Sequence, residues 1–396
     1  MIHPDGVAVL CVDDRWLALG LHAGPLILLS PDGEELQRLV GHAGGTLAVV
    51  PVRESDASTL VSAGADGHVR TWAVGSSGTA CSPPLESGIR GAHGTLVDSL
   101  AVGAGLWAAA AGRCIAVGML SGTGSVASVG PQPHAIDGLA FCGSQQPGGT
   151  TYLAASSFGG VTLWRQCGDV PEGDGEEEEA TAAARAPRFE RLRSLPACQP
   201  SEAATLSFDG WSRALVAAPS GGWLACAASL SVDEPQHVRL WRVSDGADFV
   251  CDGHEGRVRA LCWSADSRMM ASCSGATASV WRFRPGGSSP AGTPPLRLRG
   301  SGATLTAASF SPCGTLLVVG ASDGTLASFA LPGQESAAVP AGEVEARVWQ
   351  PAGVEDGDEV EQLGWVRSSG LVVACFASGL VVCGGAGAVT DRARLQ

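Results

Sequence analysis

One serine lies in a setting that could support catalysis. Residues 320–324 read GASDG, which matches the GxSxG pattern of nucleophilic serines in acyl transfer. In that chemistry the serine, here Ser322, lies on a sharp turn between a strand and a helix. Apolar alternation continues on both sides of this pentapeptide, so the pattern favours a β-hairpin turn instead. We therefore expect no catalytic residue here. The first strands of the repeats described below offer Val, Leu, Ala and Cys rather than paired carboxylates, so we expect none there either.

Histidine and cysteine could together hold a metal ion if the chain grouped them. The eight histidines are spread along the chain, and the thirteen cysteines occur singly without a CxxC pair. Metal sites need such ligands at short, regular spacings. We therefore expect no metal ion and no cofactor, and we expect most cysteines to be small buried thiols in strands. The chain also has no lysine, which excludes a P-loop lysine and a Schiff-base lysine.

The charge balance points to the kind of partner. A formal net charge of −14 argues against nucleic acid, which is bound through clustered cations. A basic or neutral protein partner fits this field better. Acidic residues are concentrated in two tracts, 168–180 and 355–361. These tracts predict either solvated loops or electrostatic docking patches for a basic partner.

No part of the sequence looks like a membrane or export segment. No apolar run approaches the roughly 20 residues that span a bilayer, and the first ten residues lack the basic start and apolar core of a secretory signal. We expect a soluble protein with no membrane partner and a cytoplasmic location. The same features are compatible with the nucleus.

The elements that carry these residues are short strands in a repeated pattern. Stretches beginning at Leu47, Val258, Leu305 and Val360 share one layout, in which an alternating strand, a polar turn, a second apolar strand, a tight turn and a third strand follow one another. Most successive third strands are separated by 40 to 52 residues, close to the roughly 40 to 45 typical of one propeller blade. One gap, from Trp164 to Trp241, is longer, at 77 residues. These third strands lie at or near Leu28, Trp72, Val117, Trp164, Trp241, Trp281, Phe329 and Val382.

The pattern predicts an all-β fold, a single closed β-propeller over residues 1–396 with eight four-stranded blades, or seven as the alternative. A lone sheet cannot bury both faces, so blades pack on their neighbours until the ring closes. Segment 166–187 is predicted to be a disordered, acidic and alanine-rich insertion between strands of the fourth unit. Residues 388–396 can supply the outer strand of the last blade. The units are centred near 7–40, 42–91, 93–130, 134–197, 205–251, 254–299, 301–348 and 354–396.

Short motifs make the chain resemble the WD40-repeat family over almost its whole length. The motifs are GH at 41–42 and at 253–254, SAGADGHVRTW at 62–72 and SDGTLASF from Ser322. Units six and seven more specifically resemble an uncharacterised group of eight-unit WD40 proteins from photosynthetic microbes. The resemblance implies a non-catalytic propeller with one hydrogen-bonded set of side chains per blade. In the second unit this structural tetrad would be His42, Ser62, Asp66 and Trp72.

The sixth unit departs from this pattern. Residues 271–283 read ASCSGATASVWRF, which predicts a second strand, a turn and a third strand ending in Trp281. Gly275 stands where Asp66 stands in the second unit. We therefore expect this unit to keep its apolar packing and to have lost its buried polar set, so that His254 would need another partner.

The family resemblance points to protein binding at the loops that precede first strands and join second to third strands. Aromatic and arginine side chains carry most of the energy of protein interfaces. The expected function is a non-enzymatic scaffold for protein–protein interactions, a monomeric propeller within a larger complex. The candidate contact residues are Phe158, Phe208, Trp211, Arg213, Arg257 and Arg259, any of which could instead pack against a neighbouring blade.

An alternative function is a substrate-receptor or regulatory subunit of a larger enzyme assembly. A receptor for a cullin-type ubiquitin ligase would show Trp-Asp-x-Arg after a third strand, whereas this chain has Trp-Ala-Val-Gly at Trp72. Service to a GTP-dependent metal chaperone is the other form of this alternative.

Overall fold

The structure is a computed structural model of the 396-residue chain. It describes residues 7–13, 15–54, 57–81, 83–89, 96–121, 126–144, 149–158, 160–167, 187–191, 205–207, 211–229, 237–283, 294–332, 344 and 346–385. All structural statements below concern these residues. The predicted insertion 166–187 falls almost entirely outside them, and the acidic tract 168–180 and the predicted closing strand 388–396 lie wholly outside them.

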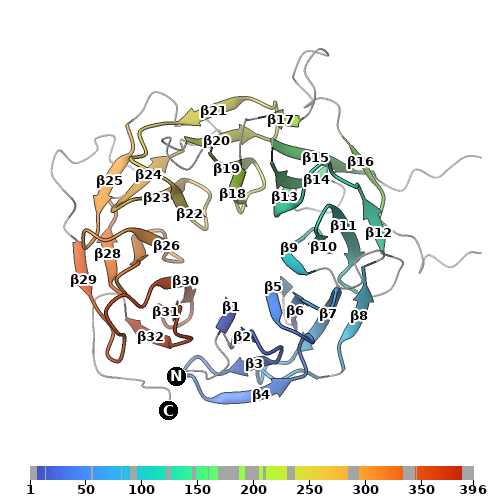
Figure 1. The fold of residues 1–396 in the computed structure, drawn as a ribbon, viewed down its shortest axis with the longest axis horizontal. Coiled ribbons are helices and arrows are strands. Elements are labelled where there is room, and N and C mark those ends of the chain that lie inside the picture. Colours follow the sequence, from blue (N-terminus) through green and yellow to red (C-terminus); the bar gives the residue numbers. More distant parts are fainter. Residues whose placement is uncertain are drawn as a thin grey trace, which may run out of the picture.

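Eight antiparallel sheets stand around a central axis as the blades of a β-propeller (Figure 1). Short strands form because alternating apolar residues place one row of side chains on each face of a sheet. The prediction of an all-β propeller with eight blades is confirmed, and the alternative with seven blades is wrong. Every predicted third strand is the third strand of its sheet.

The first four blades follow one another along the chain, each running from an inner to an outer strand. Blade one contains β1 (Val7–Val12), β2 (Leu17–Leu21), β3 (Leu26–Leu29) and β4 (Glu35–Leu39). Blade two contains β5 (Thr46–Glu54), β6 (Ala57–Gly64), β7 (His68–Val74) and β8 (Leu85–Gly88). Blade three contains β9 (Val97–Gly103), β10 (Leu106–Ala111), β11 (Cys114–Met119) and β12 (Ala127–Val129). Blade four contains β13 (Ile136–Gly143), β14 (Thr151–Ser157), β15 (Gly160–Gln166), β16 (Phe189–Arg191) and β17 (Thr205–Ser207).

The last four blades complete the ring. Blade five contains β18 (Trp211–Ala217), β19 (Trp223–Ser229), β20 (His237–Arg242) and β21 (Asp248–Cys251). Blade six contains β22 (Val258–Trp263), β23 (Met269–Ser274), β24 (Thr277–Arg282) and β25 (Leu296–Arg299). Blade seven contains β26 (Leu305–Phe310), β27 (Leu316–Ala321), β28 (Leu326–Ala330) and β29 (Ala346–Trp349). Blade eight contains β30 (Val360–Val366), β31 (Leu371–Phe376) and β32 (Val381–Gly385).

One predicted unit boundary is wrong. Unit five was expected to begin near residue 205, but β17 pairs with β15 of blade four, with Val161 opposite Leu206. The fourth sheet therefore has two short outer strands, β16 and β17, side by side along β15. Sequence periodicity missed this because β17 has only three residues, too few to show an alternating pattern.

The core is a ring of apolar layers, each between two neighbouring sheets. Blade one packs on blade eight through Val7, Leu19 and Leu21 against Val373 and Cys375, which closes the ring between the two ends of the repeat array. Burying an apolar side chain of this size contributes about 1.5–3 kcal/mol. Since every blade lacks a core of its own, this contribution depends on the complete ring.

Where the ring closes, the inner strands of blades one and eight lie so close together that position 364 has room only for glycine. A Cβ atom added to Gly364 of β30 would lie 2.4 Å from Cγ2 of Val12 in β1. No larger residue fits without a shift of the inner strands. Beside it, the Leu10 amide of blade one donates a hydrogen bond of 2.7 Å to Oε1 of Gln362 in blade eight.

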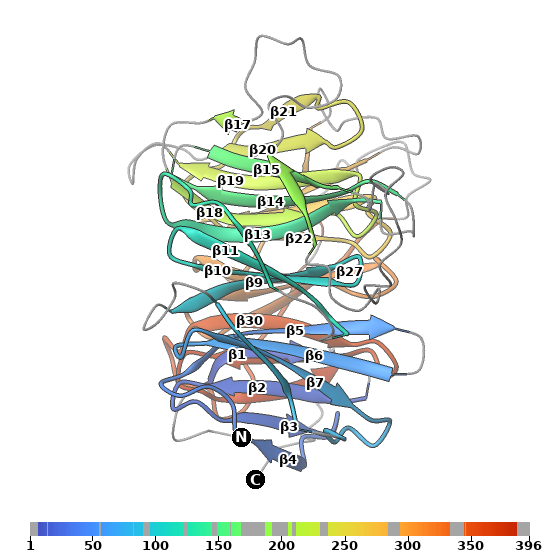
Figure 2. The same cartoon turned by 90° about the vertical axis from the view of Figure 1, so that its right-hand side faces the viewer.

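Antiparallel pairing sets which loops share a face. The loops between blades and the turns from second to third strands meet on one face of the ring, here called the top face, and the turns from first to second strands meet on the other. The side view shows the strands of the blades stacked between these two faces (Figure 2). Within the described part of the chain, no helix is long and apolar enough to cross a membrane.

Candidate functional site

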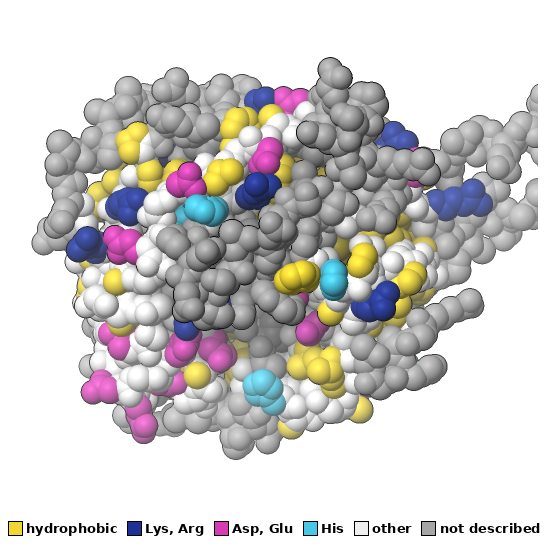
Figure 3. Space-filling model, turned by 45° about the horizontal axis from the view of Figure 1, so that its top comes forward, with side chains coloured by type: hydrophobic (Ala, Val, Ile, Leu, Met, Phe, Trp, Pro, Cys, Tyr) yellow, Lys and Arg dark blue, Asp and Glu magenta, His cyan; other side chains and the backbone are white. Residues whose placement is uncertain are grey.

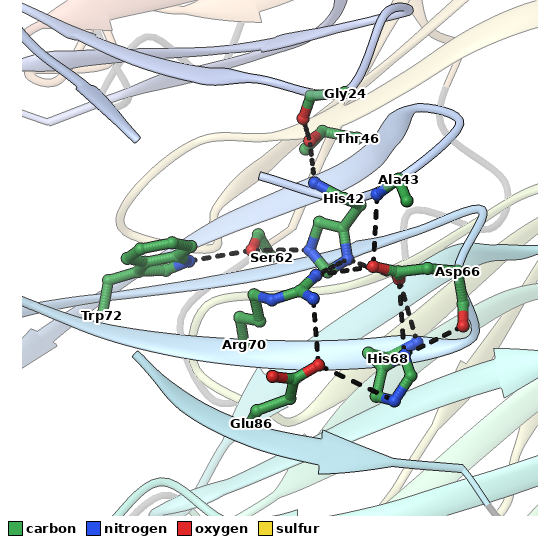
Figure 4. Close-up of polar contacts among 10 residues, drawn as sticks. All are labelled: Gly24, His42, Ala43, Thr46, Ser62, Asp66, His68, Arg70, Trp72 and Glu86. Atoms are coloured by element: carbon green, nitrogen blue, oxygen red, sulfur yellow. Dashed lines mark hydrogen bonds and ion pairs between the residues drawn. The ribbon is translucent and has the colours of Figure 1, made fainter. Parts of the chain in front are cut away.

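The four residues of the predicted tetrad form one hydrogen-bonded chain in blade two (Figure 4). Nε1 of Trp72 in β7 donates to Oγ of Ser62 in β6 over 2.9 Å, and this hydroxyl also meets Nε2 of His42 at 2.9 Å. Nδ1 of His42 lies 2.8 Å from Oδ1 of Asp66 in the turn between these strands. Because an indole N–H can only donate, the Ser62 hydroxyl oxygen accepts from Trp72. Nδ1 of His42 lies between two charged groups, since Nη1 of Arg70 is 2.7 Å from it on the other side.

Two further charged side chains, Arg70 and Glu86, extend this hydrogen-bonded cluster. Nη1 of Arg70 lies 2.7 Å from Oδ2 of Asp66, and its Nη2 lies 2.9 Å from Oε1 of Glu86 on the outer strand β8. Burial would raise the pKa of Asp66, but hydrogen bonds from Arg70 and His42 outweigh it and lower that pKa to about 2. Burial lowers the pKa of His42, with Arg70 adding to the effect and Asp66 opposing it. The cluster thus pairs a carboxylate with a neutral imidazole.

The sixth blade keeps most of its polar set, so the prediction that it had lost this set is wrong. Nε2 of His254 lies 2.8 Å from Oγ of Ser272, and Nε1 of Trp281 donates to the same hydroxyl over 3.1 Å. The strands and turn predicted for residues 271–283 are confirmed as β23 and β24. The aspartate is the one member that blade six lacks. Its turn between the second and third strands is shorter than that of blade two, and Gly275 stands at the position of Asp66. The position of this serine within the repeat was a signal for the set. Ser272 lies two positions after Met270, which pairs with Trp281. In the same way, Ser62 lies two positions after Leu60, which pairs with Trp72.

The GASDG pentapeptide is a hairpin turn, as predicted. It joins β27 to β28, two paired strands, with no helix following Ser322. Asp323 accepts hydrogen bonds from the amide of Thr325 over 3.0 Å and from the hydroxyl of Ser301 over 3.2 Å. Ser301 follows Gly300 as His42 follows Gly41, so a serine stands at the place of the histidine in blade seven.

A cavity of about 610 Å³ lies in the central channel. The first strands of several blades line it, mainly with small and apolar residues such as Leu10, Val49, Ala260, Ala307 and Leu363. This size is within the range of about 300–1,000 Å³ that is usual for ligand sites. Only three charged residues line it, Arg259 and Glu361 at the start of their strands and Arg367 just after the end of β30. The start of a first strand is its top end, so Arg259 and Glu361 mark the top mouth of the channel.

The acidic tract 355–361 meets a predicted contact residue at this mouth. Nη1 of Arg259 in blade six lies 2.9 Å from Oε1 of Glu359, which precedes the first strand of blade eight. Glu361 follows two positions later and lines the cavity. Burial and the neighbouring carboxylates of Glu359 and Asp358 raise the pKa of Glu361, partly opposed by His22. On the face drawn in Figure 3, acidic side chains gather toward the lower left.

The structure separates the other predicted contact residues. Phe158 is exposed in the turn after β14, and its ring stacks edge-on against His134 at 5.2 Å. Arg257 is half-buried just before β22. Phe208 lies outside the described residues, as do the side chains of Trp211 and Arg213. Of the six candidates, Arg259 alone is shown at the charged mouth.

Metal-ligand groups of three or more His, Cys, Asp or Glu side chains do not occur in the described ranges. Six of the eleven described cysteines are buried, all of them within strands: Cys142, Cys226, Cys251, Cys273, Cys375 and Cys383.

Cys313 differs from these buried thiols and should be the first cysteine to react with iodoacetamide near neutral pH. It is exposed in the turn after β26, and hydrogen bonds involving the hydroxyls of Ser311 and Thr315 lower its pKa to about 7. The thiolate is the nucleophile, so peptide mass spectrometry after brief alkylation should find label at this position first. Thr315→Val should slow the labelling because it removes the contact of 2.9 Å to the sulfur. Faster labelling of buried Cys142 would contradict the expected order.

Comparison with known proteins agrees with this architecture. Residues 248–282 and 292–327 match the family model described as WD domain, G-beta repeat. The structure is similar to the β-propeller domain of Cps50 (Swd1) from Myceliophteria thermophila, with a TM-score of 0.56, 13% identity, and coverage of 97% of this chain and 98% of that chain. It is also similar to Sqt1 from Chaetomium thermophilum, with a TM-score of 0.68, 18% identity, and coverage of 98% and 97%. No curated protein matches the sequence. At these identities the likeness concerns the fold.

The first matched segment begins at the outer strand β21 of blade five and ends with the third strand β24 of blade six. The sequence repeat is therefore offset from the structural blade by one strand. This offset places His254 on a loop between blades and Ser272 and Trp281 inside one blade, so their hydrogen bonds tie the loop to the sheet.

Proposed function

We propose that this WD40-type β-propeller is a non-enzymatic scaffold that binds a protein partner across the top mouth of its central channel. The observation that carries the proposal is the position of Arg259, Glu359 and Glu361 around a cavity with small and apolar walls. WD40 propellers generally act as platforms for protein interactions, which supports the same assignment. A role as a substrate-receptor or regulatory subunit of a larger enzyme assembly would be a special case of this binding.

The ring makes such a platform effective because it fixes the loops of several blades at one rim. Blades six and eight both contribute charged groups, and their positions are set by inner strands packed into the ring core. A partner then meets a surface that is already ordered, which reduces the entropy lost on binding. Arg259 and Glu359 are 100 residues apart in the sequence, so only the closed ring brings these two side chains together.

Charge reversal at the mouth tests this proposal. Glu361→Arg should remove a specific partner recovered by affinity capture from extracts of the native organism, reducing its yield at least about tenfold, since a like-charge contact costs several kcal/mol. Glu34→Arg is the matched control, because Glu34 is exposed in the turn between β3 and β4 on the opposite face. Recovery of the same partners in the same amounts with both variants would refute binding at the top mouth.

A further inference from the structure

We propose that the top mouth of the channel is a seat for an arginine side chain of a basic peptide, and that Arg259 of this chain occupies the seat when no partner is bound. This inference rests on the proposed function and specifies the chemistry of the partner at that site. It assigns Arg259 a role opposite to that of a contact anchor, since this side chain would compete with the partner.

A guanidinium already lies in the seat. Arg259 reaches from β22 of blade six to Glu359 of blade eight, with 2.9 Å between Nη1 and Oε1. The two side chains are 41% and 39% exposed. Ion pairs of this exposure contribute only about 0–1 kcal/mol, so a partner's cation can replace Arg259 at small cost.

A second carboxylate beside this pair is uncompensated. Glu361 lines the cavity, and it has no hydrogen bond or ion pair with any residue that the structure describes. Other carboxylates of the same tract are engaged: Asp358 accepts from the amide and hydroxyl of Ser378, at 2.8 and 2.6 Å, and Glu359 holds Arg259. Of Asp358, Glu359 and Glu361, Glu361 alone has no hydrogen-bond or ion-pair partner among the described residues, and Arg259 is the cation that contacts the group.

The electrostatics of Glu361 favour an additional cation. Its pKa is raised first by burial and next by Glu359, with Asp358 adding to the effect and His22 opposing it. The ionised form of Glu361 is thus less favourable than in water, and a cation placed beside it would relieve the repulsion from Glu359.

Two polar neighbours of the rim make hydrogen bonds inside the ring. The Gln362 side chain accepts the amide hydrogen of Leu10, and the Thr306 hydroxyl donates to the carbonyl of Val360 over 2.6 Å. A planar guanidinium can bridge two carboxylates with its fork of donors, which an ammonium group cannot do as well. The apolar wall below, with Ala260 and Leu363, suits the methylene stem of a long side chain.

Fluorescence anisotropy with fluorescein-labelled hexa-arginine tests the seat directly on the full chain. Glu361→Gln should weaken binding about fivefold, the effect of losing one partly exposed ion pair. Arg259→Ala should strengthen binding about threefold because the competing guanidinium is gone. Hexa-lysine should bind more weakly than hexa-arginine to the unmodified protein.

Controls separate a seat from general attraction to an acidic protein. Glu34→Gln removes the same charge from the opposite face and should change affinity by less than about twofold, because separate exposed charges are screened beyond about 10 Å. All variants should unfold at the temperature of the unmodified protein, since each altered side chain is exposed. Equal effects of Glu361→Gln and Glu34→Gln, or weaker binding after Arg259→Ala, would overturn the inference.

Failure of this inference and failure of the proposed function would look different. Suppose that Glu361→Arg abolishes capture of the native partner, but that neither Glu361→Gln nor Arg259→Ala changes the affinity for hexa-arginine. The top mouth then binds a partner of other chemistry, and the proposed arginine seat is wrong. If neither experiment responds to the rim, both ideas are wrong.

Discussion

Ser62→Ala should lower the free energy of unfolding by about 3 kcal/mol, because it leaves two buried groups without a partner at about 1–3 kcal/mol each. The groups are Nε1 of Trp72 and Nε2 of His42, each 2.9 Å from the serine hydroxyl. The alanine side chain adds no steric strain to a site that is fully buried. Urea denaturation of the purified chain, followed by tryptophan fluorescence, measures the change as a lower midpoint at an unchanged slope.

The matched control is Ser156→Ala in blade four. Ser156 also lies in the second strand of its blade and is also buried, but its hydroxyl makes a single long bond of 3.4 Å to the carbonyl of Gly138. This substitution should cost about 1 kcal/mol or less. Equal losses for the two serines would mean that burial of the hydroxyl, and not the polar chain through Ser62, determines the effect.

Acid should weaken the protein through the same cluster, by about 2 kcal/mol as Asp66 becomes protonated. The pKa of Asp66 is about 2 in the folded state and 3.8 as its ordinary value, and one pKa unit corresponds to about 1.4 kcal/mol. Because the folded pKa is the lower one, this stability is complete above pH 3.8 and is lost as the pH falls toward 2.

His42 adds to the loss at higher pH. Its folded pKa lies below the ordinary value of 6.5, so the unfolded chain binds the proton more readily and stability starts to fall as the pH drops below 6.5. Urea midpoints measured from pH 7 down to about pH 3 should therefore decline in two stages.

The substitution Asp66→Asn tests whether protonation of Asp66 causes the second stage of this decline, the one at lower pH. It should destabilise the chain at pH 7 and flatten the decline below pH 4, because the amide does not titrate. Asp252→Asn is the control: Asp252 pairs with His237 at 2.6 Å, but the side chains are 68% and 49% exposed, and such pairs contribute little. A decline below pH 4 that is as steep in Asp66→Asn as in the unmodified protein would assign acid sensitivity to other carboxylates.

The polar chain of blade two is one member of a graded series. Blade six keeps the histidine, serine and tryptophan without the aspartate, and blade seven keeps Asp323 with Ser301 in place of the histidine. The serine of blade six, Ser272, is buried, whereas Ser301 of blade seven is exposed. Since buried polar groups need partners, the retained serine of blade six keeps both the histidine and the tryptophan paired.

The sequence by itself predicted eight blades, with seven as the alternative, and the polar chain of blade two. Most third strands carry a large apolar residue near their end, and most of these residues recur at the spacing of one repeat. This spacing follows from the length of chain needed for one sheet of short strands and its turns. His42, Ser62, Asp66 and Trp72 could be aligned because they lie within one repeat, where spacing along the chain translates directly into spacing in the blade.

Only the tertiary structure decided what lies at the channel mouth. Arg259 and Glu359 are 100 residues apart and meet because blade seven separates their blades by a fixed rotation around the ring. The place of β17 in the fourth sheet likewise depends on contacts that no local pattern encodes. Periodicity follows from the backbone of each blade, whereas the meeting of side chains from different blades depends on how the closed ring packs, and this packing sets the charge and shape of the candidate site.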